Sequence, residues 1–336
     1  MAEVFYGGQA VIEGVMIRSP RYVSVACRLP QADGAPGVDT PIDLHTEEIR
    51  SLLNRRPWLR RVPVLRGFLA LFEMLGLGLR CLERSGNLQL PAAQALLVWP
   101  ALALGSNGDS NGHEGAGALN GPLMWGTILL SFALGIALFV LLPNVVAHWL
   151  MRWWHLPEDG WVLSVIEGAL RLAVFVGYVL AIGRMREIRR VFMYHGAEHK
   201  VVNAWEAGLE PDLEHAAGQS TIHPRCGTNF AFIVIVVSVV AFAFLPGGLN
   251  VLTRLGLRLA CLPLIAGVSF ELIRLVARVR VLRPCVAPGL WLQRLTTREP
   301  TPDMVEVALA SFGAVRTAEE TGELTRLVKS SVGAPA

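Results

Sequence analysis

Four long stretches of apolar residues stand out along the chain. They cover residues 123–142, 161–183, 229–245 and 255–277. A helix needs about 20 predominantly apolar residues to cross the hydrocarbon core of a bilayer, and a buried strand rarely runs so long. The pattern therefore predicts an all-α integral membrane protein with about four transmembrane helices.

Charged residues interrupt two of these stretches. Glu167 and Arg171 stand four positions apart in the second stretch, so on a helix they share one face and can pair with each other. The fourth stretch contains Arg258, Glu271 and Arg274. Charges inside a span are costly unless they are paired. We expect them to form ion pairs that pack helices together or to belong to a functional site.

Arginine is unevenly distributed among the polar segments. It is concentrated in residues 50–61, 184–190 and 274–283, whereas the connections 148–160 and 246–254 contain one arginine each. Cytoplasmic segments carry the excess of basic residues in membrane proteins. We therefore expect a multi-pass protein of the inner, cytoplasmic membrane, with both termini and the loop 184–228 in the cytoplasm.

This topology divides the chain into three regions. Residues 1–122 are expected to be cytoplasmic or interfacial, 123–277 to form the membrane domain, and 278–336 to form C-terminal helices and a tail. Two inserts, 31–41 and 106–121, are rich in Gly, Asn and Asp and are predicted to be flexible loops.

Two helices are predicted outside the spans. Arg66, Glu73 and Arg80 recur every seven residues, so on a helix they form a narrow polar stripe on an apolar surface. We expect such a helix to pack in the membrane interface or under the other helices. Near the C-terminus, Thr301 fits an N-cap and Pro302 the first position of a short helix.

The composition supports a membrane protein. Of the 336 residues, 53% are hydrophobic and 17% charged, whereas soluble domains carry about 25% charged residues. The mean hydropathy is +0.46. The lipid bilayer is therefore the predicted partner, and the net charge of +3 does not indicate a nucleic-acid partner. Five scattered cysteines do not form the pattern of a disulfide framework.

The segment YHGAEHKVVNAWE, residues 194–206, carries the most distinctive chemistry. On a helix, His195 and His199 project from one face a turn apart and can bind one metal ion. Glu198 completes the spacing H-x-x-E-H, the reverse of a zinc-protease helix in which Glu accepts a proton from metal-bound water. The pattern predicts a divalent metal site. Zinc fits these ligands, while Fe²⁺ and Mn²⁺ stay open, and a solvent-facing helix turn is the alternative.

A catalytic zinc ion needs three protein ligands and one open position. The turn HPRCGT offers His223 and Cys226 as third ligand, and Glu271 near the cytoplasmic end of the fourth stretch is a further candidate. Arg225 of the same turn can stabilise developing negative charge.

Other ionisable residues carry weaker signals. Glu13 is a single acid among glycines in an apolar run. Because glycines permit tight turns and close approach of the backbone, Glu13 is a candidate catalytic residue. Glu206 and His215 lie in or beside a polar segment and are expected to face solvent.

Five motifs occur in order along the chain: GGQAVIEGVMIR, FMYHGAEHKVVNAWE, HPRCGTNF, SFELIR and PGLWLQRLTTREP. In this order they resemble the bacterial YqhQ family, from Tyr6 to about Phe312. The resemblance implies an integral membrane protein of unknown function, in a family often described as predicted metal-dependent enzymes. The positions that match the family's two chemical motifs are His195, Glu198, His199, His223, Arg225 and Cys226. Asn229 replaces the Ser that usually follows CGT.

The sequence thus predicts a membrane-embedded, metal-dependent hydrolase that acts at the cytoplasmic face. Its substrate would be a peptide bond in a membrane protein, or a lipid-linked ester or phosphate. A non-catalytic scaffold or regulator with a structural metal site, or with none, is the alternative. A small transporter is a third possibility, disfavoured by only four spans without a clear inverted repeat.

Overall fold

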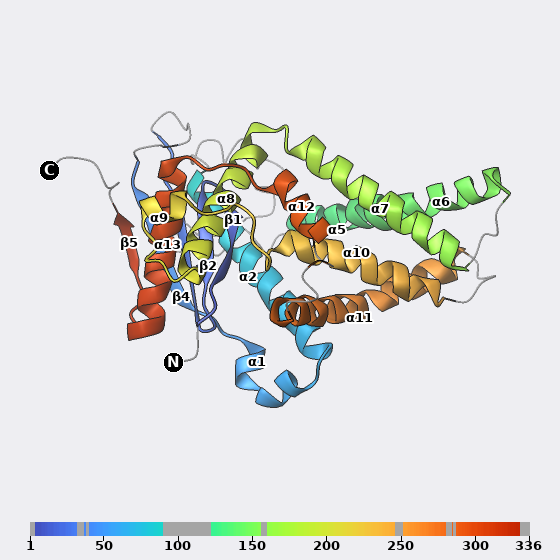
Figure 1. The fold of residues 1–336 in the computed structure, drawn as a ribbon, viewed down its shortest axis with the longest axis horizontal. Helices are drawn as coiled ribbons and strands as arrows, with labels where there is room; N and C mark the ends of the chain where they lie inside the picture. The colour runs from blue at the N-terminus through green and yellow to red at the C-terminus, as the bar shows by residue number, and fades with distance from the viewer. Residues whose placement is uncertain are drawn as a thin grey trace.

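The computed structural model describes residues 4–31, 37, 40–89, 122–155, 160–245, 251–279, 284 and 287–329. The predicted insert 106–121 lies outside these residues, and the predicted loop 31–41 is described only in part. The described chain has two parts: a sheet covered by helices, and an elongated bundle of helices (Figure 1).

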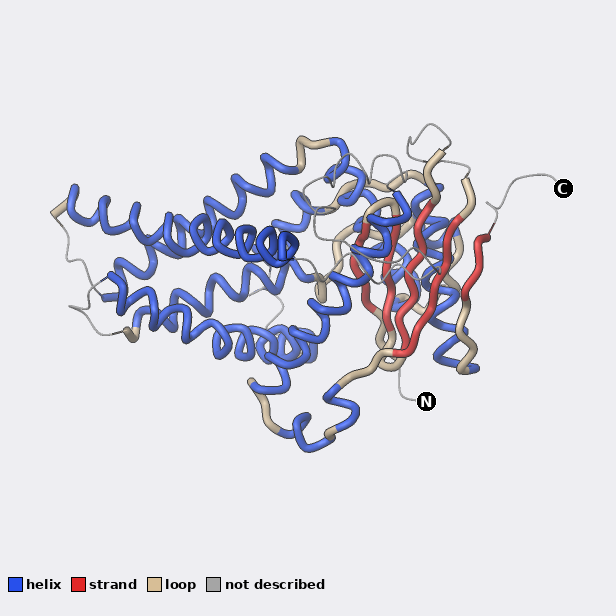
Figure 2. Tube along the Cα trace, turned by 180° about the vertical axis from the view of Figure 1, so that it is seen from behind, coloured by secondary structure: helices blue, strands red, loops and turns tan. Residues whose placement is uncertain are grey.

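The first part is built on a five-stranded antiparallel sheet, so the all-α prediction is wrong (Figure 2). The strands, in spatial order, are β1 (Gly7–Val11), β2 (Gly14–Arg18), β3 (Tyr22–Arg28), β4 (Ile42–Glu48) and β5 (Arg326–Lys329). In β4, Ile42, Leu44 and Thr46 are buried and alternate with more exposed residues, the period of a strand with one face in a core. The helices remain the larger share of the structure.

Helices cover both faces of this sheet. On one face lie α8 (Arg186–Glu206), α9 (Leu213–Ala217) and α13 (Pro302–Thr321), and their apolar side chains share a core with β2, β3 and β4. On the other face lies α2 (Leu65–Gln89), whose Leu77 and Cys81 pack against Val11, Met16 and Val25. The predicted helix at 62–82 is thereby confirmed, although it begins at Leu65 and continues for about two further turns at its C-terminal end.

The bundle contains α5 (Pro122–Ile136), a π-helical turn η3 (Ala137–Leu141), α6 (Leu142–Trp153), α7 (Gly160–Ile182), α10 (Gly227–Ala243) and α11 (Val251–Arg278). Within the described residues, three segments are long and apolar enough to cross a membrane: Leu129–Trp153, Trp161–Ile182 and Thr253–Val276. The predicted span at 229–245 forms α10, an apolar helix of only 17 residues. Length and composition therefore support three spans, and the fourth is not confirmed.

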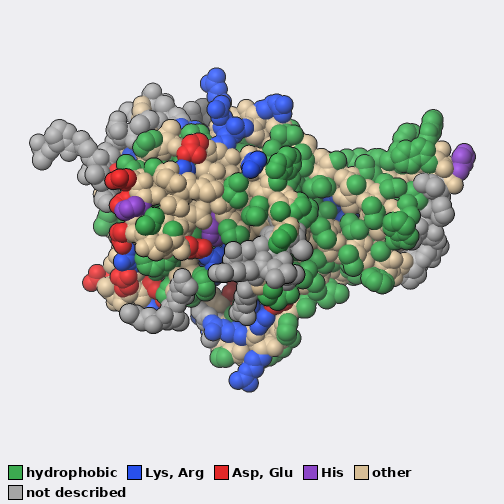
Figure 3. Space-filling view, viewed as in Figure 1, with side chains coloured by type: hydrophobic (Ala, Val, Ile, Leu, Met, Phe, Trp, Pro, Cys, Tyr) green, Lys and Arg blue, Asp and Glu red, His purple; other side chains and the backbone are tan. Residues whose placement is uncertain are grey.

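The surfaces of the two parts differ. On the face shown in Figure 3, hydrophobic side chains gather over the bundle, whereas acidic side chains gather over the sheet-containing part. Trp149, Trp153 and Trp161 are 58%, 69% and 70% exposed at one end of the bundle. A solvent-exposed apolar surface of this kind fits contact with lipid.

The C-terminal segment belongs to the sheet-containing part. Helix α13 begins at Pro302 with Thr301 as N-cap, as predicted, and continues to Thr321. Strand β5 then pairs with β4, with His45 opposite Arg326. The two ends of the chain therefore form one unit, and the bundle is inserted between them. Three short helices, α1 (Leu52–Arg55), η1 (Pro57–Arg61) and α12 (Ala287–Thr296), complete the described fold.

Candidate metal centre

The two histidines of the H-x-x-E-H segment lie on α8, as predicted. The ring centroids of His195 and His199 are 4.4 Å apart. Between them, Gly196 allows the chain after α12 to cross α8 closely, because a Cβ there would lie 2.1 Å from the carbonyl oxygen of Arg298. This glycine therefore lets the segment after α12 lie directly against the helix that carries both imidazoles.

Backbone carbonyls orient both imidazole rings. The Nδ1 atom of His195 lies 2.9 Å from the carbonyl oxygen of Thr296, and that of His199 lies 2.6 Å from the carbonyl oxygen of Thr221. A carbonyl oxygen only accepts hydrogen bonds, so each Nδ1 carries the proton in the neutral ring. Each Nε2 then presents a lone pair, as it does in metal-binding histidines whose other nitrogen is hydrogen-bonded. Thr296 is the last residue of α12, where carbonyls have no partner within the helix.

Cys226 supplies a third donor atom. Its Sγ lies 3.2 Å from Nε2 of His195, and the donor atoms of His195, His199 and Cys226 all lie within 4.8 Å of one another. Cys226 is the N-cap of α10 and is 7% exposed. Ligands around a tetrahedral zinc ion are roughly 3.3–3.8 Å apart, so the three donors fit such an ion after small adjustments.

Glu198 lies beside this cluster under strand β1. It is 4% exposed, and its Oε2 is 3.5 Å from Nε2 of His199. A Cβ at Gly8 would lie 3.1 Å from Cγ of Glu198 and 2.2 Å from the carbonyl oxygen of Met16. Glycine at position 8 thus lets the strand pass directly over the carboxylate.

His223 lies next to the cluster but faces another partner. Its Nε2 is 3.3 Å from Oε1 of Glu206, and its ring centroid is 5.6 Å from that of His199. The backbone of His223 exchanges two hydrogen bonds with the buried amide of Gln293, at 2.9 and 2.8 Å. Burial lowers the pKa of His223, while Glu198 opposes this effect. His223 therefore stays neutral and anchors the turn to α12.

Glu206 is exposed, as expected, and it also has partners in the structure. Besides His223 it pairs with Arg225, whose guanidinium also lies 4.7 Å from the ring centroid of Phe5. His215 is exposed beside Asp212, in agreement with its predicted solvation.

Two predicted site residues are not brought to the cluster. Glu271 accepts hydrogen bonds from Nε and Nη2 of Arg66 on α2, the first at 2.7 Å. Glu13 pairs with Arg190 and accepts a longer hydrogen bond of 3.3 Å from Tyr194. Glu13 also has φ of +52° at the β1–β2 turn, a backbone conformation that few residues other than glycine adopt. Burial and the nearby Glu13 raise the pKa of Tyr194, which keeps its hydroxyl protonated.

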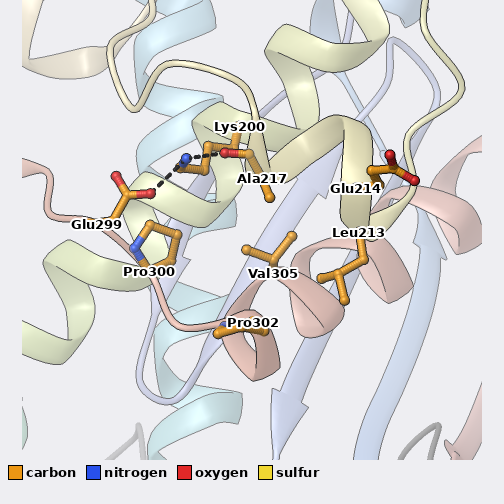
Figure 4. Close-up of a pocket in the computed structure, with 8 residues that line it drawn as sticks. All are labelled: Lys200, Leu213, Glu214, Ala217, Glu299, Pro300, Pro302 and Val305. Carbon is orange, nitrogen blue, oxygen red and sulfur yellow. Dashed lines mark hydrogen bonds and ion pairs between the residues drawn. The ribbon is translucent and has the colours of Figure 1, made fainter.

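A pocket of about 410 Å³ opens near Lys200, which directly follows His199 in α8 (Figure 4). Lys200 is buried, and its Nζ lies 2.7 Å from both the carbonyl oxygen of Ala217 and Oε1 of Glu299. The remaining walls are mostly apolar, from Leu213, Pro300, Pro302 and Val305 among others. None of the three donor residues lines this pocket, so it is distinct from the metal-type cluster.

Sequence reasoning missed the groups that position the donors. The carbonyls of Thr221 and Thr296 are backbone atoms that any residue supplies, so no side-chain pattern marks them. Gln293 is 0% exposed, but its signal in the sequence was weak, because it stands beside the polar residue Arg294 in α12.

The fold and the cluster belong to an uncharacterised protein family. The chain is a member of the family described as "Protein of unknown function (DUF1385)", which matches residues 62–318. It is also similar to the uncharacterized protein YqhQ of Bacillus subtilis (strain 168), with 30% identity over 325 residues that cover 95% of this chain and 94% of that protein. The resemblance drawn from the five motifs is thereby confirmed. No solved structure matches the chain.

Proposed function

We propose that the chain is a membrane-embedded, metal-dependent hydrolase that acts at the cytoplasmic face of the inner membrane. The observation that carries this proposal is the orientation of the two imidazoles. Their Nδ1 atoms are bonded to the carbonyls of Thr296 and Thr221, which leaves both Nε2 lone pairs available, and Nε2 of His195 lies 3.2 Å from Sγ of Cys226. Side chains that only pack in a core have no need of this arrangement.

His195, His199 and Cys226 would hold the ion, and two imidazoles with one thiolate suit zinc. A bound zinc ion supplies Lewis acidity and lowers the pKa of a bound water to about 7. Glu198 is placed to accept a proton from a molecule held beside Nε2 of His199, at the 3.5 Å separation of their side chains. Arg225 is paired with Glu206, so it would stabilise negative charge only after that pair opens.

Four spans would give this protein a consistent topology. The sheet-containing part holds both described ends of the chain and also α8, all at one end of the bundle (Figure 1). The chain therefore leaves the sheet-containing part and returns to it twice. It does so first through α5–α6 and α7, and again through α10 and α11. Counting the 17-residue α10 as a short fourth span agrees with this arrangement and with the arginine-rich segments on the same side.

The substrate is proposed to come from the membrane. Cys226 is the N-cap of α10, so the donor cluster lies where the sheet-containing part meets the bundle. A peptide bond of a membrane protein or a lipid-linked ester or phosphate would reach the cluster at this boundary.

Metal analysis tests the proposal. Purified wild type is expected to contain one divalent ion per chain, and His195→Ala and Cys226→Ala to lose it. Glu198→Gln is expected to keep the ion and lose hydrolysis, because the amide cannot accept the proton. Wild-type protein without stoichiometric metal, after purification without chelators, would overturn the proposal.

A structural metal site is the second candidate function. It is favoured by the burial of the cluster, in which His199 and Glu198 are 1% and 4% exposed. Cobalt substitution separates the two functions. An open coordination position predicts that added azide changes the visible spectrum of the cobalt protein, whereas a closed set of four protein ligands predicts no change.

A further inference from the structure

A second buried polar cluster lies within the helical bundle. Its charged members are Glu167 and Arg171 on α7 and Arg258 on α11, which are 1%, 8% and 3% exposed. Asn144 on α6 and Ser238 on α10 complete the cluster, at 8% and 4% exposed. None of these five residues is a donor of the proposed metal centre. Ionisable groups at such positions in apolar bundles are usually functional.

The single carboxylate of this cluster is paired with one of the two arginines. Glu167 forms an ion pair with Nη2 of Arg258 at 2.8 Å and accepts a hydrogen bond from Nδ2 of Asn144 at 2.7 Å. It thus pairs across the bundle with α11, and not along its own helix with Arg171 as the spacing had suggested.

The guanidinium of Arg171 is held by neutral groups. Its Nε donates to the carbonyl oxygen of Phe139 at 2.9 Å, within the π-helical turn, and its Nη1 donates to Oγ of Ser238 at 2.8 Å. Arg171 and Arg258 also lie 5.5 and 5.1 Å from the ring centroid of Phe242. Within the described part of the chain, two donors of these arginines have no hydrogen-bond acceptor: Nη2 of Arg171 and Nε of Arg258, both buried.

The cluster therefore carries an excess of one positive charge among the described residues. Arginine stays protonated in proteins, so it cannot remove this charge by losing a proton. A buried charge without a counter-charge is strongly unfavourable. An anion that binds here would relieve that cost and would fill the two vacant donors.

We propose that this cluster binds an anionic phosphate group, supplied by a lipid head group or by inorganic phosphate. Guanidinium groups match the oxygens of phosphate in both charge and planar geometry. A chain of hydrogen bonds links the cluster to Arg254, one helical turn before Arg258 on α11. Arg254 is partly exposed and bonded to Nε2 of His148, whose Nδ1 in turn lies 2.9 Å from the carbonyl oxygen of Asn144.

A matched pair of variants at Ser238 tests the proposal in the full-length protein. Because Oγ of Ser238 is 2.8 Å from Nη1 of Arg171, Ser238→Asp places a carboxylate where the counter-charge is missing. Ser238→Asn has nearly the same size without the charge. Thermal unfolding would be followed in non-ionic detergent without phosphate, and then with inorganic phosphate, phosphatidylglycerol or phosphatidylcholine as separate probes.

We expect wild type and Ser238→Asn to be stabilised saturably by inorganic phosphate or by phosphatidylglycerol. Ser238→Asp should unfold at a higher temperature than Ser238→Asn without any probe, and should lose affinity for the probe by about tenfold or more. Stabilisation by phosphatidylglycerol alone identifies a lipid as the source, and stabilisation by inorganic phosphate identifies the free ion.

Three results would overturn the proposal. The first is a wild type that is stabilised neither by inorganic phosphate nor by phosphatidylglycerol. The second is a wild type that chloride stabilises as much as these probes do. The third is a phosphate effect that persists in Ser238→Asp. If Ser238→Asp does not fold, Arg171→Gln takes its place, since it removes the excess charge; a phosphate effect of wild-type size in Arg171→Gln overturns the proposal equally.

Discussion

The two parts of the molecule bury arginine in different ways. In the sheet-containing part, Arg28 is 0% exposed and has its own carboxylate, Glu306 at 2.6 Å, together with the carbonyls of Thr40 and Asp303. In the bundle, Arg171 and Arg258 stand beside one carboxylate. A matched pair ties α13 to β3 and leaves no charge for a ligand. The excess positive charge in the bundle can instead bind an anion. Arginines that are equally buried can therefore stabilise packing in one part and bind a ligand in the other.

The largest effect is expected where the buried cluster loses the one carboxylate among its described residues. Glu167→Gln leaves two guanidiniums buried without a carboxylate, and breaking such a pair costs about 3–5 kcal/mol. Unfolding in phosphate-free detergent measures this loss. A second substitution, Arg258→Met, should recover much of it, because the double variant again carries one excess charge. A Glu167→Gln protein as stable as wild type would contradict our account of the bundle.

A smaller loss is expected for the matched pair in the sheet-containing part. Glu306→Gln leaves Arg28 buried without its carboxylate, but a quarter of the Glu306 side chain is exposed and water replaces part of the interaction. We expect a loss of about 2–3 kcal/mol in the free energy of unfolding. The control is Glu320→Gln, which breaks an exposed pair with Arg316 and should cost less than about 1 kcal/mol. Equal losses of stability in the two variants would contradict the claim that the buried pair contributes more than the exposed one.

Gly196 allows a test of whether the segment after α12 positions the candidate metal centre. Gly196→Ala would push the segment after α12 away from α8, since the new Cβ meets the carbonyl oxygen of Arg298. The expected cost is about 1–3 kcal/mol. Metal content should also fall, because the Thr296 carbonyl that orients His195 moves with that segment. Gly313→Ala is the control, since its Cβ meets open space on α13. Unchanged metal content in Gly196→Ala would show that α12 does not position the site.

The smallest effect concerns pH in the sheet-containing part. Burial lowers the pKa of His45, and Arg84 and Arg326 lower it further. The unfolded chain therefore binds a proton more readily than the folded one as pH falls below about 6.5. His45 thus contributes to a loss of stability in acid that is absent above that pH. Melting temperatures between about pH 7.5 and 5.5 should fall less in His45→Gln than in wild type. Parallel curves would contradict the assigned cause.

The apolar helices could be predicted from the sequence because their signal is local. The sheet was harder to find. Residues 42–48 do alternate, but β3 is buried on nearly every residue because helices cover both of its faces, so it shows no period of two. Strand β5 has four residues and pairs with a strand near the other end of the chain. No local pattern in the sequence predicts that β5 pairs with β4.

The candidate site shows the same limit. The spacing of His195 and His199 follows from helical geometry and was predictable. The choice among His223, Cys226 and Glu271 depended on competing partners. Glu271 is hydrogen-bonded to Arg66, which is 205 positions away in the sequence, and His223 is hydrogen-bonded to Glu206. Which partner each side chain binds depends on tertiary packing, and the residue type alone does not reveal it.

The pairing of β5 with β4 has a consequence for biosynthesis. A ribosome releases β1 to β4 first, and the strand and helix that complete their core emerge only after every bundle helix has been made. The early strands therefore keep an unpaired edge and an uncovered face while the apolar helices are synthesised. A chain truncated before α13 would leave that face open and is expected to be cleared by proteases or held by chaperones.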